Sequence, residues 1–236
     1  NFHGFTQPLP VNTAYRELQP LLLPALWPPS PENQAATGEY IATRGMPAFQ
    51  AAVSGGQHEF PDGMFFGGTS PTWSNQTVRT VLRQHGQGVK KLAWIDLHTG
   101  LGPSGLGERI FAGRDDAATL ARARAWWGEQ VTSMYDGSST SARLTGVMCL
   151  AAYDELPKAE YTAMAMEYGT LPIAEVMHAL RGEHWLHQHP EAPPALAKQI
   201  RQQMLEAFYT DTDEWKGQII SQARQAMFQA VDGLNA

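Results

Sequence analysis

The hydrophobic positions of the chain change spacing several times, from short continuous runs to helical periodicity. Apolar runs at 92–97, 144–152 and 161–166 are typical of strands buried in a sheet. A shorter run at 64–66 predicts one more strand. Strands alternate with helices along most of the chain, which predicts an α/β fold. Apolar residues at helical spacing, with proline and capping residues at the ends, predict helices at 14–23, 31–43, 46–55, 74–85, 115–132, 173–187, 195–209 and from 211 onward.

Polar side chains stand at the ends of two predicted strands. Asp96 and His98 close the first of these strands, and Glu167 closes the last. Ligands of α/β folds bind beyond the carboxyl ends of the strands, so these three residues are candidates for chemistry. A glycine-rich segment at 100–113 and a polar segment at 135–141 are predicted to be loops, and the polar loop is a candidate for substrate contact.

Composition narrows the classes of protein that fit this pattern. The 236 residues carry a formal charge of −6, and 43% are hydrophobic, which predicts one folded domain over 1–236 and argues against nucleic-acid binding. No apolar run reaches the length of a membrane span, so no membrane partner is expected. The single cysteine, Cys149, excludes an internal disulfide framework and favours the cytoplasm. It lies in an apolar run and is expected to be a buried, inert thiol.

His98 has the chemistry of a zinc ligand. A neutral imidazole binds zinc through one nitrogen while a carboxylate orients the other, and Asp96 lies on the same face of the strand two residues earlier. The alternative is a histidine at a strand end that bonds only to backbone.

Glu167 has the chemistry of a general base. A carboxylate that follows a buried strand is partly desolvated, which raises its pKa toward the range useful for proton transfer. The alternative is a glutamate in a surface turn or a structural salt bridge.

A second concentration of histidines lies near the end of the predicted helix 173–187. His184, His187 and His189 are close in sequence, but their spacing matches no zinc motif. They are either an independent metal site or solvated groups that interact with the helix dipole.

Four segments together resemble the zinc carboxypeptidase superfamily, in particular its succinylglutamate desuccinylase and aspartoacylase branch and an uncharacterised bacterial family within it. The segments are Pro-Thr-Trp-Ser-Asn at 71–75, Ile-Asp-Leu-His-Thr-Gly-Leu-Gly at 95–102, Glu-Tyr-Gly-Thr at 167–170 and Glu-His-Trp-Leu-His at 183–187. The resemblance implies a mixed sheet flanked by helices. It also implies zinc as cofactor, with His98 as a metal ligand, Glu167 as general base and Tyr135 on a mobile loop that contacts substrate.

The chain departs from the superfamily in its metal ligands. The resemblance implies a His-x-x-Glu pair that supplies two of the three zinc ligands, and the chain contains no such pair. Asn1-Phe2 looks like the end of the substrate-binding segment that follows the pair. The chain is therefore expected to be the C-terminal portion of a longer domain, with a sheet edge covered by a retained N-terminal segment or by a second copy of the chain.

These observations predict a zinc-dependent hydrolase of amide bonds in the intact protein, acting on a peptide C-terminus or an N-acyl amino acid. A catalytic zinc site needs three protein ligands, and this chain is expected to provide one of them, His98. The alternative is a non-catalytic binding or structural protein of the same fold with an incomplete metal site.

Overall fold

The centre of the molecule is a four-stranded mixed sheet. The computed structural model describes residues 8–236, so Asn1-Phe2 lies outside the described residues. The strands are β1 (Lys91–Ser104), β2 (Gly107–Phe111), β3 (Thr132–Ser133) and β4 (Glu160–Gly169), in the order β1-β4-β2-β3. β4 runs parallel to β1 and antiparallel to β2, and β3 runs parallel to β2. The predicted α/β class with a mixed sheet flanked by helices is confirmed.

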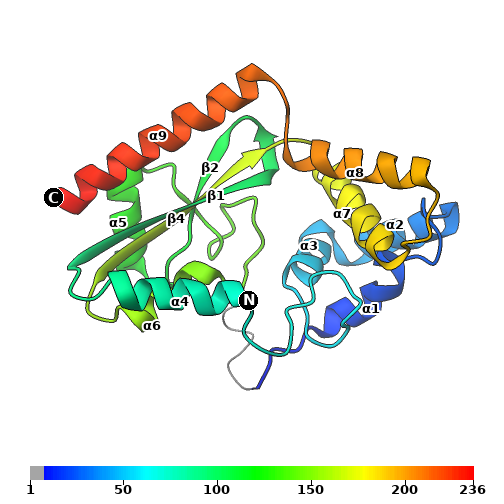
Figure 1. The fold of residues 1–236 in the computed structure, drawn as a ribbon, viewed down its shortest axis with the longest axis horizontal. Helices are drawn as coiled ribbons and strands as arrows, with labels where there is room; N and C mark the ends of the chain where they lie inside the picture. Colours follow the sequence, from blue (N-terminus) through cyan, green and yellow to red (C-terminus); the bar gives the residue numbers. More distant parts are fainter. Residues whose placement is uncertain (1–7) are drawn as a thin grey trace.

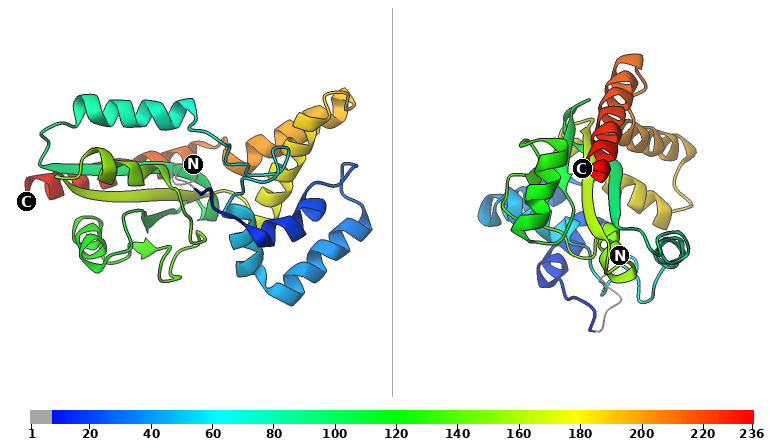
Figure 2. Two further views of the ribbon diagram at one scale, coloured as in Figure 1. Left: turned by 90° about the horizontal axis from the view of Figure 1, so that it is seen from below. Right: turned by 90° about the vertical axis from the view of Figure 1, so that its left-hand side faces the viewer.

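The helices form two groups, one around the sheet and one beyond the end of the sheet at which β4 terminates (Figure 1). Figure 2 shows α4 and α5 on opposite faces of the sheet. The group around the sheet is α4 (Trp73–His85), α5 (Ala117–Trp127), α6 (Ala151–Glu155) and α9 (Asp213–Asn235). The second group is α1 (Thr13–Leu22), α2 (Pro31–Arg44), α3 (Met46–Ser54), α7 (Ile173–Gln188) and α8 (Pro194–Phe208).

The side chains of β4 alternate between two hydrophobic cores. Tyr161 and Ala163 belong to the core under α4 and α6, whereas Met164 and Met166 belong to the core under α5 and α9. Successive side chains of a strand point to opposite faces. Glu167 therefore points to the α4 side. It is the only acidic residue among the buried side chains of residues 8–236.

The sequence predicted a strand at 144–152, and this prediction is wrong, because the run leads into a helix. It contains a 3-10 helix, Met148–Leu150, followed by α6. Ala151 and Ala152 are fully buried against the sheet, and alanine has the highest helix propensity. A short apolar run does not distinguish a strand from a buried helical segment, which explains the error.

The predicted strand at 64–66 is also wrong. Phe65 adopts a left-handed backbone conformation with φ of 54°, which a strand does not tolerate. Phe66 forms one isolated bridge with Gln57.

Most of the glycine-rich segment at 100–113 is strand rather than loop. β1 continues to Ser104 and β2 begins at Gly107, so the segment forms a hairpin-like return beside β4. A Cβ atom on Gly169 would lie 2.0 Å from the carbonyl oxygen of Gly102. Glycine at 169 thus allows two backbone segments to touch where the register of β1 and β4 shifts.

Within residues 8–236, the structure contains no helix with the combined length and apolar character that crossing a membrane requires.

Candidate active site

Three titratable side chains form a row across adjacent strands. His98 of β1 pairs with Glu167 of β4, and Glu167 pairs with Glu108 of β2. Residues directly opposite one another in a sheet point to the same face, so the three side chains lie on one surface. The structure thus brings together His98 and Glu167, the two residues singled out as ligand and base.

The His98 imidazole lies between two carboxylates. Its Nε2 is 3.1 Å from Oδ1 of Asp96, and its Nδ1 is 3.9 Å from Oε2 of Glu167. The hydrogen bond to Asp96, reinforced by the charges of Asp96 and Glu167, raises the pKa of His98 above its usual value. Asp96 therefore orients the ring so that Nδ1 faces the Glu167 side.

The Glu167 carboxylate is held in a largely buried position. Its side chain is 12% exposed, and its Oε1 accepts a hydrogen bond of 3.0 Å from the Leu101 backbone amide. Burial raises the pKa of Glu167, as do the negative charges of Glu108 and Asp96, and these effects exceed the lowering by the Leu101 amide and by His98. A desolvated carboxylate with a raised pKa is suited to accepting a proton near neutral pH.

A bend in β1 places the Leu101 amide beside Glu167. The regular pairing of β1 with β4 stops after Thr99, and Gly100 adopts φ of 134°. A Cβ atom on Gly100 would lie 2.8 Å from the Phe208 ring, so only glycine fits at this point. Thr99 Oγ1 also donates to the Phe208 carbonyl, which fixes α8 against the bend.

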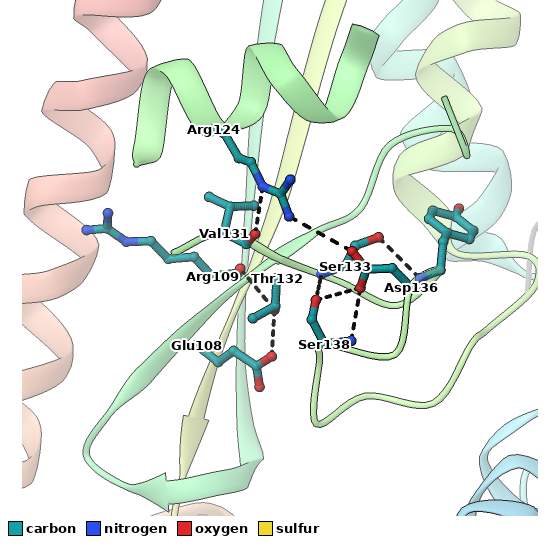
Figure 3. Close-up of polar contacts among 9 residues, drawn as sticks. Glu108, Arg109, Arg124, Val131, Thr132, Ser133, Asp136 and Ser138 are labelled. Carbon is teal, nitrogen blue, oxygen red and sulfur yellow. Dashed lines mark hydrogen bonds and ion pairs between the residues drawn. The ribbon is translucent and has the colours of Figure 1, made fainter. Parts of the chain in front are cut away.

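Glu108 is the member of the row that sequence reasoning missed. Its carboxylate accepts a hydrogen bond of 2.6 Å from Thr132 Oγ1 (Figure 3). It also accepts hydrogen bonds from the amide and hydroxyl of Thr140. These contacts anchor a negative charge next to Glu167. Glu108 lies in the glycine-rich segment that was predicted to be a loop. The sequence therefore gave no sign that Glu108 pairs with Glu167 across two adjacent strands.

The polar loop at 135–141 is tied to its surroundings by side-chain hydrogen bonds. Asp136 Oδ1 accepts bonds from the amide and hydroxyl of Ser138, and Ser138 Oγ accepts from the Ser133 amide (Figure 3). The Tyr135 hydroxyl donates to the Gly113 carbonyl at 2.9 Å. In this conformation the Tyr135 hydroxyl is used in the bond to Gly113 and not in a contact with His98. The contact of Tyr135 with substrate stays a prediction.

The histidines near the end of α7 do not converge. His184 Nε2 bonds to the Asp62 carbonyl, and His189 stacks on Trp185 and bonds to its carbonyl. His187 is exposed. These contacts support the reading as helix-end groups rather than as a metal site. Cys149 is buried, and burial raises the pKa of its thiol to about 12, as expected for an inert core cysteine.

A cavity of about 640 Å³ opens next to Glu167. It lies between the end of the sheet and the second group of helices, and its wall is mostly apolar. Among the described residues, Glu167 and Arg181 are the only Asp, Glu, Lys or Arg side chains that line it. The larger apolar side chains of the wall include Ile41, Met46, Phe49, Phe65, Met177 and Phe208.

Comparison with protein families matches residues 1–222 to the family described as "Protein of unknown function (DUF2817)". The chain belongs to this family. The DUF2817 match includes every strand and the whole row formed by His98, Glu167 and Glu108. Searches of curated proteins and of solved structures found no match.

The described part of the DUF2817 chain does not contain a complete metal site. Residues 8–236 include no group of three or more His, Cys, Asp or Glu side chains placed to hold one metal ion. His98 fits the role of one ligand, because Asp96 orients its ring and leaves Nδ1 available. A catalytic zinc site needs two further protein ligands.

The Glu108→Gln substitution in the DUF2817 chain is expected to lower the pKa of Glu167. Removing the negative charge removes one cause of the raised value. The midpoint of Glu167 ionisation, followed by NMR of the side-chain carboxyl carbon, should move to lower pH. Glu191→Gln, at an exposed position in the turn between α7 and α8, is the charge-matched control and should leave the midpoint unchanged. An unchanged or higher midpoint in Glu108→Gln would contradict the assignment.

Proposed function

We propose that this chain carries one half of the active site of a zinc-dependent hydrolase of amide bonds, related to the zinc carboxypeptidase superfamily. The observation that carries the proposal is the pairing of His98 with Glu167. A buried carboxylate with a raised pKa faces the free side of an imidazole that a second carboxylate holds in place. Carboxylates with a pKa shifted by burial beside a specific charged partner are concentrated at functional sites, and α/β sheets bind ligands at the carboxyl ends of their strands.

In this proposal His98 is a zinc ligand and Asp96 is its orienting partner. The remaining ligands are the His-x-x-Glu pair that the superfamily resemblance implies, and they are outside the described residues. Zinc, when bound, would polarise the amide carbonyl and favour ionisation of a water molecule.

Glu167 moves the proton during the reaction. Its carboxylate accepts a proton from the attacking water and passes it to the amide nitrogen as the carbon–nitrogen bond breaks. The products are a carboxylic acid and an amine. The Leu101 amide holds Oε1, which leaves Oε2 on the side of His98 to take the proton. Tyr135 is proposed to contact the substrate after movement of its loop. The substrate is a peptide C-terminus or an N-acyl amino acid, and the single cysteine favours action in the cytoplasm.

The second candidate is a non-catalytic protein of the same fold. One observation favours it, namely that residues 8–236 hold no group of three metal ligands. It requires no zinc and no hydrolysis.

Zinc content of the natural full-length gene product separates the two functions. We expect about one zinc per chain by mass spectrometry, and loss of most of it in His98→Ala, because one of three protein ligands is removed. His85→Ala is the control, since His85 is exposed at the end of α4 and should leave zinc bound. A full-length product without zinc and without hydrolysis of N-acyl amino acids or peptides would establish the non-catalytic reading.

A further inference from the structure

The cavity beside Glu167 contains a buried positive charge without a carboxylate partner. Arg181 of α7 is 8% exposed and lines the cavity. No carboxylate of residues 8–236 forms an ion pair with it, and burial alone lowers the pKa of its guanidinium. The guanidinium has hydrogen bonds and lies 5.9 Å from the centre of the Trp27 ring, but these contacts supply no negative charge. A buried cation without an ionic partner favours a ligand that brings a counter-charge.

The hydrogen bonds of Arg181 leave one nitrogen free. Nε donates to the Leu22 carbonyl, and Nη2 donates to the Leu21 carbonyl and to Asn33 Oδ1. These bonds fix the guanidinium against the end of α1. Nη1 donates to no described residue. A rigid guanidinium with a free N–H edge is a preferred partner of carboxylates.

The shape of the cavity sets the length of a ligand. Both Ile173, the first residue of α7, and Arg181 line the cavity, and the eight residue steps from one to the other correspond to about 12 Å of helix. Glu167 lies near the Ile173 end, because β4 ends at Gly169 just before α7 begins. The wall between the two ends is mostly apolar, with His178 of α7 and Gln50 of α3 among its polar side chains. The volume is within the range of small-molecule sites.

We propose that this cavity binds an amphipathic carboxylate whose carboxylate contacts Arg181 and whose apolar body extends along α7 toward Glu167. The inference rests on the proposed function for the reaction at Glu167. It assigns the substrate class as an amide with an apolar arm of about 12 Å that ends in a carboxylate. Arg181 binds the arm, and Glu167 acts on the amide at the other end.

The test measures binding without the reaction. Isothermal titration calorimetry compares decanoate with decanol, which has an alkyl chain of the same length and no charge. We expect decanoate to bind about ten- to a hundredfold more tightly, the effect of a charged hydrogen bond in a desolvated site. In Arg181→Gln this preference should disappear, whereas in Arg201→Gln, an exposed position on α8, it should persist.

A second variant keeps the test decisive if Arg181→Gln does not fold. Gly38 of α2 lines the cavity, and a Cβ atom there meets no other atom within 4 Å. Gly38→Leu places a larger side chain in the cavity, and leucine has a higher helix propensity than glycine. The substitution should lower the affinity for both decanoate and decanol by about tenfold or more. Gly217→Leu on α9 is the matched control, because Gly217 has equal free space and lies outside the cavity wall.

The outcomes separate the cavity from the reaction. Absence of decanoate binding, equal affinity for the two ligands, or unchanged binding in Gly38→Leu would overturn the cavity assignment, even if the protein hydrolyses amides. Binding with the expected preference in a full-length protein that lacks zinc and hydrolytic activity would uphold the cavity assignment and overturn the proposed function.

Discussion

Glu167→Gln is expected to lower the kcat/KM for amide hydrolysis by the full-length, zinc-loaded protein about 10²- to 10⁴-fold, the usual contribution of a general base. Glutamine has nearly the same shape, and its carbonyl oxygen can still accept the Leu101 amide hydrogen bond. The substitution therefore removes the proton acceptor and preserves the site around it. Zinc content should stay at the wild-type value, because His98 is the proposed ligand in this chain.

The control for this substitution is Glu191→Gln, which removes an exposed carboxylate and should retain full activity. A Glu167→Gln protein with zinc bound and near wild-type kcat/KM would exclude Glu167 as the base. Loss of zinc together with activity would instead show that Glu167 holds the metal.

The stability of Glu167→Gln provides an independent check of the environment of the carboxylate. Burial raises the pKa of Glu167 in the folded state above its ordinary value of 4.5. The folded state then binds more protons than the unfolded state above that value, so the wild-type protein loses stability as pH rises through the folded pKa. The variant lacks this loss. Its free energy of unfolding, relative to wild type, should increase as pH rises above 4.5 and level off above the folded pKa of Glu167.

Trp127→Ala is expected to lower the free energy of unfolding by about 3–5 kcal/mol, a large part of the stability of a typical domain. Trp127 is fully buried in the core between the sheet and the helices α5 and α9. Its indole Nε1 donates to the Ala226 carbonyl at 3.0 Å, which joins α5 to α9. The substitution leaves a cavity beside Phe111 and Met164 and removes that bond.

Trp73→Ala is the matched control for this prediction. Trp73 is 78% exposed at the start of α4, so the same change of side chain should alter stability by no more than about 0.5 kcal/mol. Urea unfolding followed by circular dichroism measures both variants. Equal losses in the two variants would show that the core around Trp127 contributes less than its burial indicates.

Most helix boundaries followed closely from the sequence. The exception is the helix predicted at 115–132, which ends at Trp127 because Gly128 adopts φ of 102°, and Thr132 belongs to β3. The predicted helix at 31–43 corresponds to α2, Pro31–Arg44, and that at 173–187 to α7, Ile173–Gln188. Their starts and ends depend on proline, capping groups and apolar spacing, which are local properties. The errors at 64–66 and 144–152 occurred in short apolar runs, where local pattern does not select between structures.

The sequence by itself determined the two apolar strands and the polar residues at their ends, Asp96, His98 and Glu167. Only β4 is buried as predicted, because β1 is an edge strand whose residues 91–97 are half-buried or exposed. An apolar run followed by chemically active side chains can be recognised from neighbouring positions in the sequence alone. Only the tertiary structure decided that Glu108 stands opposite Glu167 and that Arg181 shares a cavity with it. Strand register and helix docking join residues distant in the chain and depend on burial, which local periodicity does not encode.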